Sequence, residues 1–285
     1  FQRDTTNTVQ AMVGVKTGGI ADGFGLVSLG ESCENDGILL NGNVDVLVTN
    51  GGIFSNSCID KTGHGSGSIK VQPPERGILF FDRWLRSPEV ADPRGQKADY
   101  QITAPNFDDE LSQRCRQIPS RGSHSGSGTL YYGRYDSISM KNKDSLVLNP
   151  GLYCIDGNFG INGTVVGNDV TVYLKSSGIT LKGGDSLHLS APSDETNYGI
   201  AGLVLYFDEG NSSSLDLGGN PDFSLTGTVL VPNGVIELSG NSSMSAPIRG
   251  QVIGKRVHLN GTDLLTINYD PSVSYKGAAT LDLLR

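Results

Sequence analysis

The stretch Ile236-Glu237-Leu238-Ser239-Gly240, followed by Val257-His258-Leu259-Asn260-Gly261, carries the phrase that decides the fold. The phrase is an apolar residue, any residue, an aliphatic residue, a small polar residue or Lys, and finally Gly or Asn. Five further copies begin at residues 38, 138, 159, 179 and 215. From residue 138 onward the starts are separated by 21, 20, 36, 21 and 21 residues. Regular recurrence at this period indicates a repeat architecture, with one longer repeat.

Most copies are followed by a second alternating stretch, as in Ser186-Leu187-His188-Leu189, and several by a third apolar stretch, as in Gly250-Gln251-Val252-Ile253. Alternation at period two is typical of a strand with one buried face. The Gly or Asn at the fifth position suits a corner with positive φ. The sequence therefore predicts an all-β fold, a single-stranded parallel β-helix (a solenoid) of about 21 residues per coil. An 18-residue hexapeptide period is absent, which favours a right-handed or irregular helix over a left-handed one.

Three regions lie outside the regular repeat. Residues 1–30 are expected to form an N-terminal strand or cap, because a solenoid needs its open end covered. The β-helix is expected over 31–270, with an irregular insert at 61–130 and a C-terminal tail or cap at 271–285. The alternative for the first strand is exchange with a neighbouring subunit. The residues that would mediate such an exchange are Val9, Ala11, Val13 and Val15.

The insert at 61–130 is rich in Pro and charged residues, and we expect it to pack on one face of the rod with short helical turns near 80–85 and 107–111. Long ordered loops often carry function. Its aromatic cluster is therefore a candidate interaction surface, and the alternative is that these aromatics anchor the insert to the rod. The cluster comprises Phe80, Phe81, Arg83, Trp84 and Arg86.

Composition excludes several classes of protein. The chain has 285 residues, a net charge of -8 and only 18% charged residues. An acidic balance argues against nucleic-acid or anionic-membrane partners. No apolar run approaches 18 residues, so we expect no membrane span. Neither a signal peptide nor a transit peptide is visible at Phe1, which suggests a processed start or a start downstream of an anchor.

Four cysteines are present, with no CxxC motif and no neighbouring His to suggest a metal site. Three pairings are possible. Cys33–Cys58 with Cys115–Cys154 would staple the cap and the insert to the rod, which suits an oxidising, extracellular location. The alternative is that all four are reduced, buried thiols.

Chemistry-bearing residues are few in the sequence. Adjacent acids occur at 108–110 and 208–209, and Asp216, Glu237 and His258 share the second position of three successive repeats. Such a row could serve in general acid and base catalysis, but any solvated strand face produces one. No hydrolase elbow, zinc motif, phosphate loop or calcium repeat is present. We therefore predict no catalytic residue, no metal and no cofactor. Candidate glycosylation sites are Asn162, Asn211, Asn241 and Asn260.

Several phrases occur in the order seen in one known family. They are the corner phrase, Gly51-Gly52-Ile53-Phe54, Pro150-Gly151-Leu152-Tyr153-Cys154 and Gly227-Thr228-Val229-Leu230-Val231. Over roughly residues 20–270 the chain resembles the β-helical extracellular region of TadG-like proteins of Flp (tight adherence, Tad) pilus systems. The resemblance implies a location outside the cell, an accessory role in a surface pilus, and no catalytic residues. The long insert departs from the family pattern.

These features predict a non-enzymatic, extracellular structural or adhesion protein, associated with a pilus or a cell-surface filament. The expected partners are pilus or surface-filament subunits, further copies of this chain, and surface glycans. One alternative is a homopolymeric filament subunit assembled by N-terminal strand exchange. Another is a carbohydrate-active β-helix enzyme, a polysaccharide lyase or hydrolase.

Overall fold

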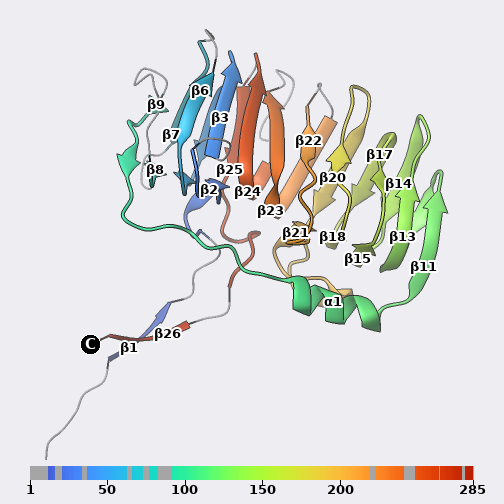
Figure 1. The fold of residues 1–285 in the computed structure, drawn as a ribbon. Helices are drawn as coiled ribbons and strands as arrows, with labels where there is room; N and C mark the ends of the chain where they lie inside the picture. The colour runs from blue at the N-terminus through green and yellow to red at the C-terminus, as the bar shows by residue number, and fades with distance from the viewer. Residues whose placement is uncertain are drawn as a thin grey trace, which may run out of the picture.

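The structure, a computed structural model, describes residues 12–16, 21–33, 37–62, 66–72, 77–82, 91–218, 222–240, 248–262, 264–277 and 280–284. It is mostly β, with a 24-stranded sheet and a separate two-stranded sheet (Figure 1). Before the helix the strands are β1 (Met12–Lys16), β2 (Phe24–Ser28), β3 (Gly37–Gly42), β4 (Asp45–Thr49), β5 (Gly52–Ser55), β6 (Ile59–Thr62), β7 (Ser68–Gln72), β8 (Ile78–Phe80), β9 (Ala91–Asp92) and β10 (Gln96–Lys97).

The helix α1 (Asp108–Gln117) follows, and a second series of strands begins directly after it. These strands are β11 (Ser120–Ser125), β12 (Gly128–Leu130), β13 (Gly133–Ser139), β14 (Asp144–Leu148), β15 (Gly151–Ile155), β16 (Phe159–Gly160), β17 (Gly163–Gly167), β18 (Val170–Leu174), β19 (Ile179–Thr180), β20 (Ser186–Ser190), β21 (Leu203–Phe207), β22 (Leu215–Leu217), β23 (Asp222–Gly240), β24 (Ile248–Gly261), β25 (Leu264–Asn268) and β26 (Thr280–Leu284). A short 3-10 segment, η2 (Thr196–Tyr198), lies between β20 and β21.

The large sheet consists of parallel strands arranged in three ladders. The first ladder runs β11, β13, β15, β18, β21, β23, β24, β2, β5, β8 and β10. The second contains β11, β13 and β16, then β19, β22, β23, β24, β3 and β6. The third runs β12, β14, β17, β20, β23, β24, β25, β4, β7 and β9. Successive strands of the chain visit the ladders in turn, so three strands, one from each ladder, form a layer.

The layers do not follow the order of the sequence. Strands β2, β3 and β4, the first of the large sheet, pair with β24 and β25, the last of it. We call residues 21–97 the N-terminal block and residues 120–268 the C-terminal block. Figure 1 shows the blue strands beside the red ones, and residues 98–119 returning below the sheet toward β11. The chain therefore starts in the middle of the stack, runs to one end, crosses back, and fills the other part.

Two expectations about domain organisation need correction. A cap was expected over 1–30, but β2 lies inside the first ladder between β24 and β5. An irregular insert was expected over 61–130, but β7, β8, β11 and β12 are regular members of the ladders. These strands lack the repeated phrase, so the sequence did not reveal them. Their backbones nevertheless pair with neighbouring strands in the same way as the repeats do. Within the described part of the expected insert, residues 98–119, the crossing segment, pack on the outside of the stack as expected.

The interior of the stack is filled by rows of buried side chains that lie in register from one strand to the next. In the first ladder, Tyr153, Val172, Leu205, Val229 and Val252 are successive partners, and all are buried. Strands of the second and third ladders alternate between buried positions and partly or fully exposed ones, as in β20 and β25. This alternation arises because each strand has one face toward the core and one toward the solvent, and it confirms the period-two prediction.

The first ladder differs because its strands β2, β5, β15, β18 and β21 are buried on both faces. Its outward row continues through Tyr173, Tyr206, Leu230 and Ile253. The crossing segment covers this row and contributes its own apolar side chains to the same cluster. These are Ala98, Phe107, Leu111, Cys115 and Ile118. Continuous apolar runs such as Leu203–Phe207 are what a strand covered on both faces requires.

Helix α1 is short, and its sequence explains both its limits and its orientation. Acidic residues occupy its first turn and Arg114 and Arg116 its last, which complements the helix dipole. Leu111 and Cys115, four residues apart, form its buried face. Pro119 follows the end of the helix. The turn expected near 107–111 is therefore the start of this helix.

Three of the corner glycines have the predicted positive φ. Gly42, Gly163 and Gly261 have φ angles of 87°, 137° and 107°. In the repeats that begin at 138 and 179 the positive φ falls one residue later, on Lys143 and Gly184. Positive φ is cheap for Gly and costly for residues with a Cβ atom, which explains the fifth-position preference.

The small second sheet pairs the two ends of the chain. Strand β1 is antiparallel to β26, with Val13 opposite Leu283 and Val15 opposite Leu281. Two of the four residues predicted to mediate strand exchange thus pair within the same chain, while Val9 and Ala11 lie outside the described residues. No helix among the described residues is long and apolar enough to cross a membrane.

Candidate functional site

A polar cavity of about 310 Å³ opens where three non-repeating segments meet. Helix α1 contributes Glu110, and the segment after β25 contributes Ser272, Ser274, Tyr275 and Lys276. The loop between β20 and β21 contributes Pro192, Ser193, Glu195, Ile200, Ala201 and Gly202. Carboxylates, hydroxyls, an ammonium group and one aromatic ring therefore face a common space. This mixture can bind a polar ligand through hydrogen bonds.

Arg114 organises one wall of this cavity. Its Nη2 donates to Glu110 Oε1 at 2.6 Å and to Glu195 Oε2 at 3.1 Å. Its Nη1 donates to the carbonyl oxygens of Tyr198 and Gly199 at 3.2 and 3.0 Å. One guanidinium thus holds the β20–β21 loop against α1, with two carboxylates directed at the same cation.

Tyr275 forms another part of the wall and stays neutral. Burial raises the pKa of its hydroxyl, and the carboxylates of Glu110 and Glu195 raise it further. Its backbone N–H donates to Thr228 Oγ1 at 2.9 Å, and its ring packs edge-on against Phe107 at 4.8 Å between centroids. The segment after β25 is therefore fixed to both the first ladder and the crossing segment.

Exposed tyrosines extend from the cavity toward the β12 end of the stack. Tyr198 is 38% exposed and Tyr131 is 57% exposed. Tyr132 lies between β12 and β13, with its ring centroid 6.1 Å from that of Tyr198. The Arg121 guanidinium lies 6.0 Å from the ring centroid of Tyr131. Rings that are apolar on the face and polar at the edge suit a contact surface.

The adjacent acids identified in the sequence have structural roles. Asp108 Oδ1 accepts a hydrogen bond from the Tyr206 hydroxyl at 2.7 Å, and its carboxylate also accepts from the Glu209 N–H. Asp208 accepts a hydrogen bond from the Tyr173 hydroxyl. Burial, followed by these carboxylates, raises the pKa of both tyrosines. The acids thus fasten α1 and the loop after β21 to the first ladder.

The predicted row of polar residues does line up. Asp216 pairs with Glu237, and Glu237 pairs with His258, in the second ladder. His258 Nδ1 lies 3.9 Å from Glu237 Oε1. Burial lowers the pKa of His258, and the Glu237 carboxylate partly opposes this effect. The row lies on an open sheet face, and the cavity does not include it.

A second group of this kind was missed by sequence reasoning. In the third ladder His188 is opposite Ser224, with His188 Nδ1 2.8 Å from Ser224 Oγ. His188 Nε2 lies 3.4 Å from Asp222 Oδ2. The sequence did contain a signal for this group, because positions 188, 222 and 224 are polar positions of two alternating stretches, 186–189 and 222–225. Asp222 and Ser224 are exposed, so this Ser–His–Asp group lies on a solvated surface.

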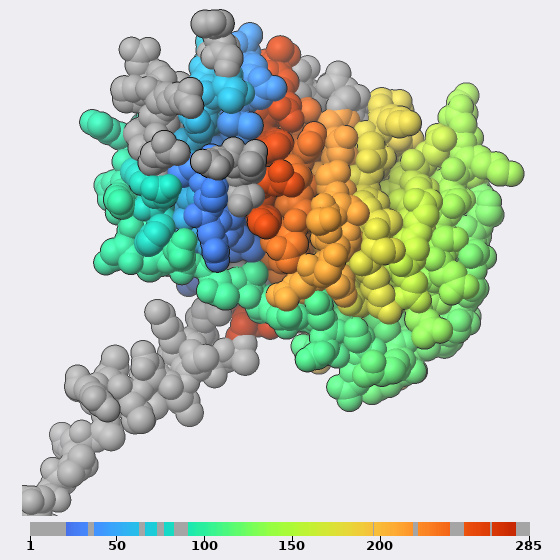
Figure 2. Space-filling view, in the orientation of Figure 1, coloured from blue at the N-terminus to red at the C-terminus, as the bar shows by residue number. Residues whose placement is uncertain are grey.

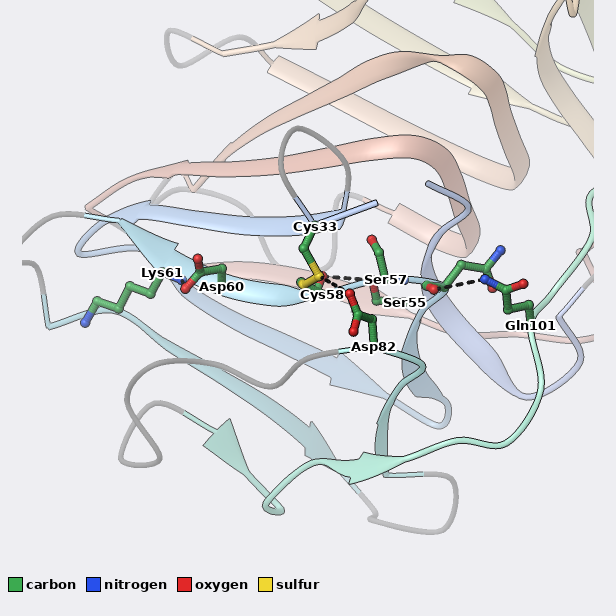
Figure 3. The surroundings of a disulfide bond; sticks show 9 residues. Cys33, Ser55, Ser57, Cys58, Asp60, Lys61, Asp82 and Gln101 are labelled. Atoms are coloured by element: carbon green, nitrogen blue, oxygen red, sulfur yellow. Dashed lines mark hydrogen bonds between the residues drawn. A yellow bond between two sulfur atoms is a disulfide. The ribbon is translucent and has the colours of Figure 1, made fainter. Parts of the chain in front are cut away.

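Two disulfide bonds join the four cysteines, and they form one of the three pairings that the sequence left open. Cys33 and Cys58 have Cα atoms 5.2 Å apart, and Cys115 and Cys154 have Cα atoms 6.0 Å apart. Figure 3 shows Asp82 beside the first bond, with Oδ2 2.9 Å from Cys33 Sγ. These three side chains have a spacing that a metal ion could use. Their sulfur atoms are bonded to each other, so the chemistry of the group does not suit a cation.

The remaining predicted site residues are divided between the core, the surface and the undescribed part. Phe80 is 8% exposed and belongs to the interior cluster, so it anchors its segment rather than forming a surface. Phe81 is partly exposed. Arg83, Trp84 and Arg86 lie outside the described residues.

The candidate glycosylation sites differ in access. Asn162 is exposed and Asn260 is partly exposed, whereas Asn211 is 3% exposed. Asn211 Nδ2 donates to the carbonyl oxygens of Leu174 and Ser177 at 3.2 and 2.9 Å. The structure therefore contradicts Asn211 as a glycan acceptor, because its amide is buried in backbone hydrogen bonds. Asn241 lies outside the described residues.

Comparison with known proteins yields no match. No protein-family model, no curated protein and no solved structure matches the chain. The cavity could not have been read from the sequence, because its three walls come from segments separated by about 70 residues or more and none carries a motif.

Proposed function

We propose that this protein is a non-enzymatic, extracellular structural and adhesion protein, built on a parallel β-helix and similar to the TadG-like proteins of Tad pilus systems. The observation that carries the proposal is the three-ladder stack with one disulfide bond inside the N-terminal block and a second that joins α1 to the C-terminal block. Stacked parallel layers form a rigid spacer, and disulfides persist outside the cytosol. Both features suit a component exposed on a cell surface or pilus.

Adhesion would use the cavity and its neighbouring tyrosines. The cavity offers the carboxylates of Glu110 and Glu195, several hydroxyls and Lys276, and Tyr198 and Tyr131 lie beyond it. Hydrogen-bonding groups beside exposed aromatic faces suit a polyhydroxylated ligand such as a surface glycan. A glycan array probed with the wild-type protein and with Tyr198→Ala tests this role.

The matched control is Tyr100→Ala, because Tyr100 is also exposed, at 47%, and packs against Phe54 in the other block. Binding that is lost in Tyr198→Ala and retained in Tyr100→Ala supports the glycan site. Equal binding by both variants contradicts it. For location, immunogold electron microscopy of the source cells should label surface filaments or the cell envelope, and labelling confined to the cytoplasm would contradict the proposal.

One observation favours a second candidate function, a carbohydrate-active enzyme. The His258 imidazole and the Glu237 carboxylate are neighbours in register on an exposed ladder, and such pairs can transfer protons. Cleavage of acidic and neutral polysaccharides by the wild-type protein, lost in Glu237→Gln and in His258→Ala, would establish this alternative. No cleavage by the wild-type protein would exclude it for the polysaccharides tested.

A further inference from the structure

The junction between the N-terminal and C-terminal blocks is a complete layer interface. All three ladders cross it, with Leu26 opposite Val252, Leu40 opposite Leu259 and Val48 opposite Ile267. These six side chains are all buried. Figure 2 shows the blue and red parts in contact across the middle of the molecule. An interface of this kind combines backbone pairing with an apolar core, so it has the strength of a domain interior.

Neither disulfide crosses this junction. Cys33–Cys58 lies within the N-terminal block, and Cys115–Cys154 ties α1 to β15 of the C-terminal block. Among the described cysteines none is free. One bond therefore crosslinks the N-terminal block within itself, the other crosslinks the crossing segment to the C-terminal block, and the crossing segment is the chain connection between the two blocks.

The crossing segment is anchored on both blocks, and the two anchors nearest to each other along the chain are at Ile102 and Asp108. On the N-terminal block, the Ile102 N–H donates to Asn56 Oδ1 at 2.7 Å, and Asn56 Nδ2 donates to the Ile102 carbonyl oxygen at 2.8 Å. On the C-terminal block, Asp108 accepts the Tyr206 hydroxyl at 2.7 Å. Residues 103–106 lie between the anchors and can reach about 14 Å when extended. Each anchor can thus stay with its own block while this short segment changes direction.

The two outer ends of the stack do not offer such an interface. At one end, Gly122 and His124 stand opposite the interior residues Tyr135 and Ile138. At the other end, Lys97 stands opposite the interior residue Phe80. Polar and small residues at core positions give a further layer little to pack against. At the junction, by contrast, separation of the two blocks would expose buried apolar side chains and unpaired backbone in all three ladders.

We propose that this junction is exchangeable, so that the N-terminal block of one copy docks on the C-terminal block of a second copy. Reciprocal exchange gives a dimer, and exchange in one direction gives a chain of copies. The contacts are the same within one molecule and between molecules, so concentration during folding decides which form accumulates. This inference concerns assembly and stands apart from the glycan site.

A cysteine pair across the junction tests the exchange. Thr49 and Asn268 are partners in register, with Thr49 Oγ1 3.1 Å from Asn268 Oδ1. Adjacent partners of this kind are close enough for a disulfide. The double variant T49C/N268C should give mainly monomer on non-reducing gels after refolding at low concentration. After refolding at high concentration it should give covalent dimers and larger species, with at least a tenfold rise in the dimer fraction. Monomer alone at every concentration would overturn the proposal.

The control pair is D45C/S68C, which joins two partners within the N-terminal block. It should remain intramolecular at all concentrations, and dimers in it would show adventitious crosslinking. Exchange through the β1 strand would leave the T49C–N268C bond intramolecular, so covalent dimers separate the two kinds of exchange. If the variants fail to fold, native mass spectrometry of co-refolded isotope-labelled and unlabelled wild-type protein decides. Mixed dimers support exchange, and purely monomeric protein contradicts it.

Discussion

The Cys115–Cys154 bond should contribute strongly to stability, because it holds the crossing segment against the first ladder. The perturbation is the double substitution C115A/C154A, in which Ala avoids burying a hydroxyl at two buried positions. The bond spans 39 residues. Loop closure of that length removes about 13 cal/mol/K of entropy from the unfolded chain, or about 4 kcal/mol at 25 °C. With a slope of about 2.5 kcal/mol/M, the urea midpoint should fall by roughly 1.5 M.

The assay is equilibrium urea unfolding under non-reducing conditions, followed by circular dichroism, together with hydrogen exchange. The control is C33A/C58A, whose bond spans 25 residues and should be worth about 3.5 kcal/mol. Amide protection in α1 should fall in C115A/C154A and not in C33A/C58A, because only the first bond reaches the helix. An unchanged midpoint, or equal loss of α1 protection in both variants, would refute the reasoning.

Three further predictions address single positions. Gly250→Ala should cost more than about 4 kcal/mol of unfolding free energy, because its Cβ would lie 2.2 Å from the Gly227 carbonyl oxygen. Gly184→Ala, also at positive φ but with no atom within 4 Å of the new Cβ, should cost only about 1–2 kcal/mol. Equal costs in urea unfolding would argue against stacked layers. Tyr206→Phe removes a hydrogen bond to a carboxylate and should lower the free energy of unfolding by about 1.5 kcal/mol. An unchanged urea midpoint would contradict that. For Asp270, hydrogen bonds from the Ser272 hydroxyl and N–H and from an arginine lower the carboxyl pKa. Its stabilisation is therefore complete above the unfolded value of about 3.9 and is lost as pH falls through the lower folded value. Asp270→Asn should destabilise at pH 7 and converge with the wild type near pH 2, and a difference that grows at low pH would contradict this account.

The strands and corners of the fold were largely predictable where the sequence contained a short repeated pattern. The recurring phrase ending in Gly261 indicated strands and corners, and the row through Glu237 and His258 lies in register as the spacing implied. The cysteine pairing was one of three that the sequence left open, and the structure shows Cys33–Cys58 and Cys115–Cys154. The strands, the corners and the row in register all follow from the period of the repeat, and such a period can be recognised in one sequence alone.

The order of the layers was not predictable in the same way. Pairing of Leu26 with Val252 joins residues more than 200 positions apart, and parallel backbone pairing leaves no mark in composition. The cavity had no local signal either, because Glu110 and Glu195 meet only through Arg114. Continuous apolar runs such as Leu203–Phe207 did mark strands buried on both faces, although the covering segment had to be seen in the structure.

The central claim is that the chain returns along the whole stack between β10 and β11. Lys97 and Ser120 are only 23 positions apart (120 − 97), and the native cysteines are all in disulfides among the described residues. Ten strand steps separate their strands in the first ladder, which corresponds to about 48 Å at about 4.8 Å per step. A pulsed electron paramagnetic resonance measurement on spin-labelled K97C/S120C should give a mean distance near that value. A distance below about 15 Å, equivalent to about three steps, would mean that the layers follow the sequence and would contradict the account.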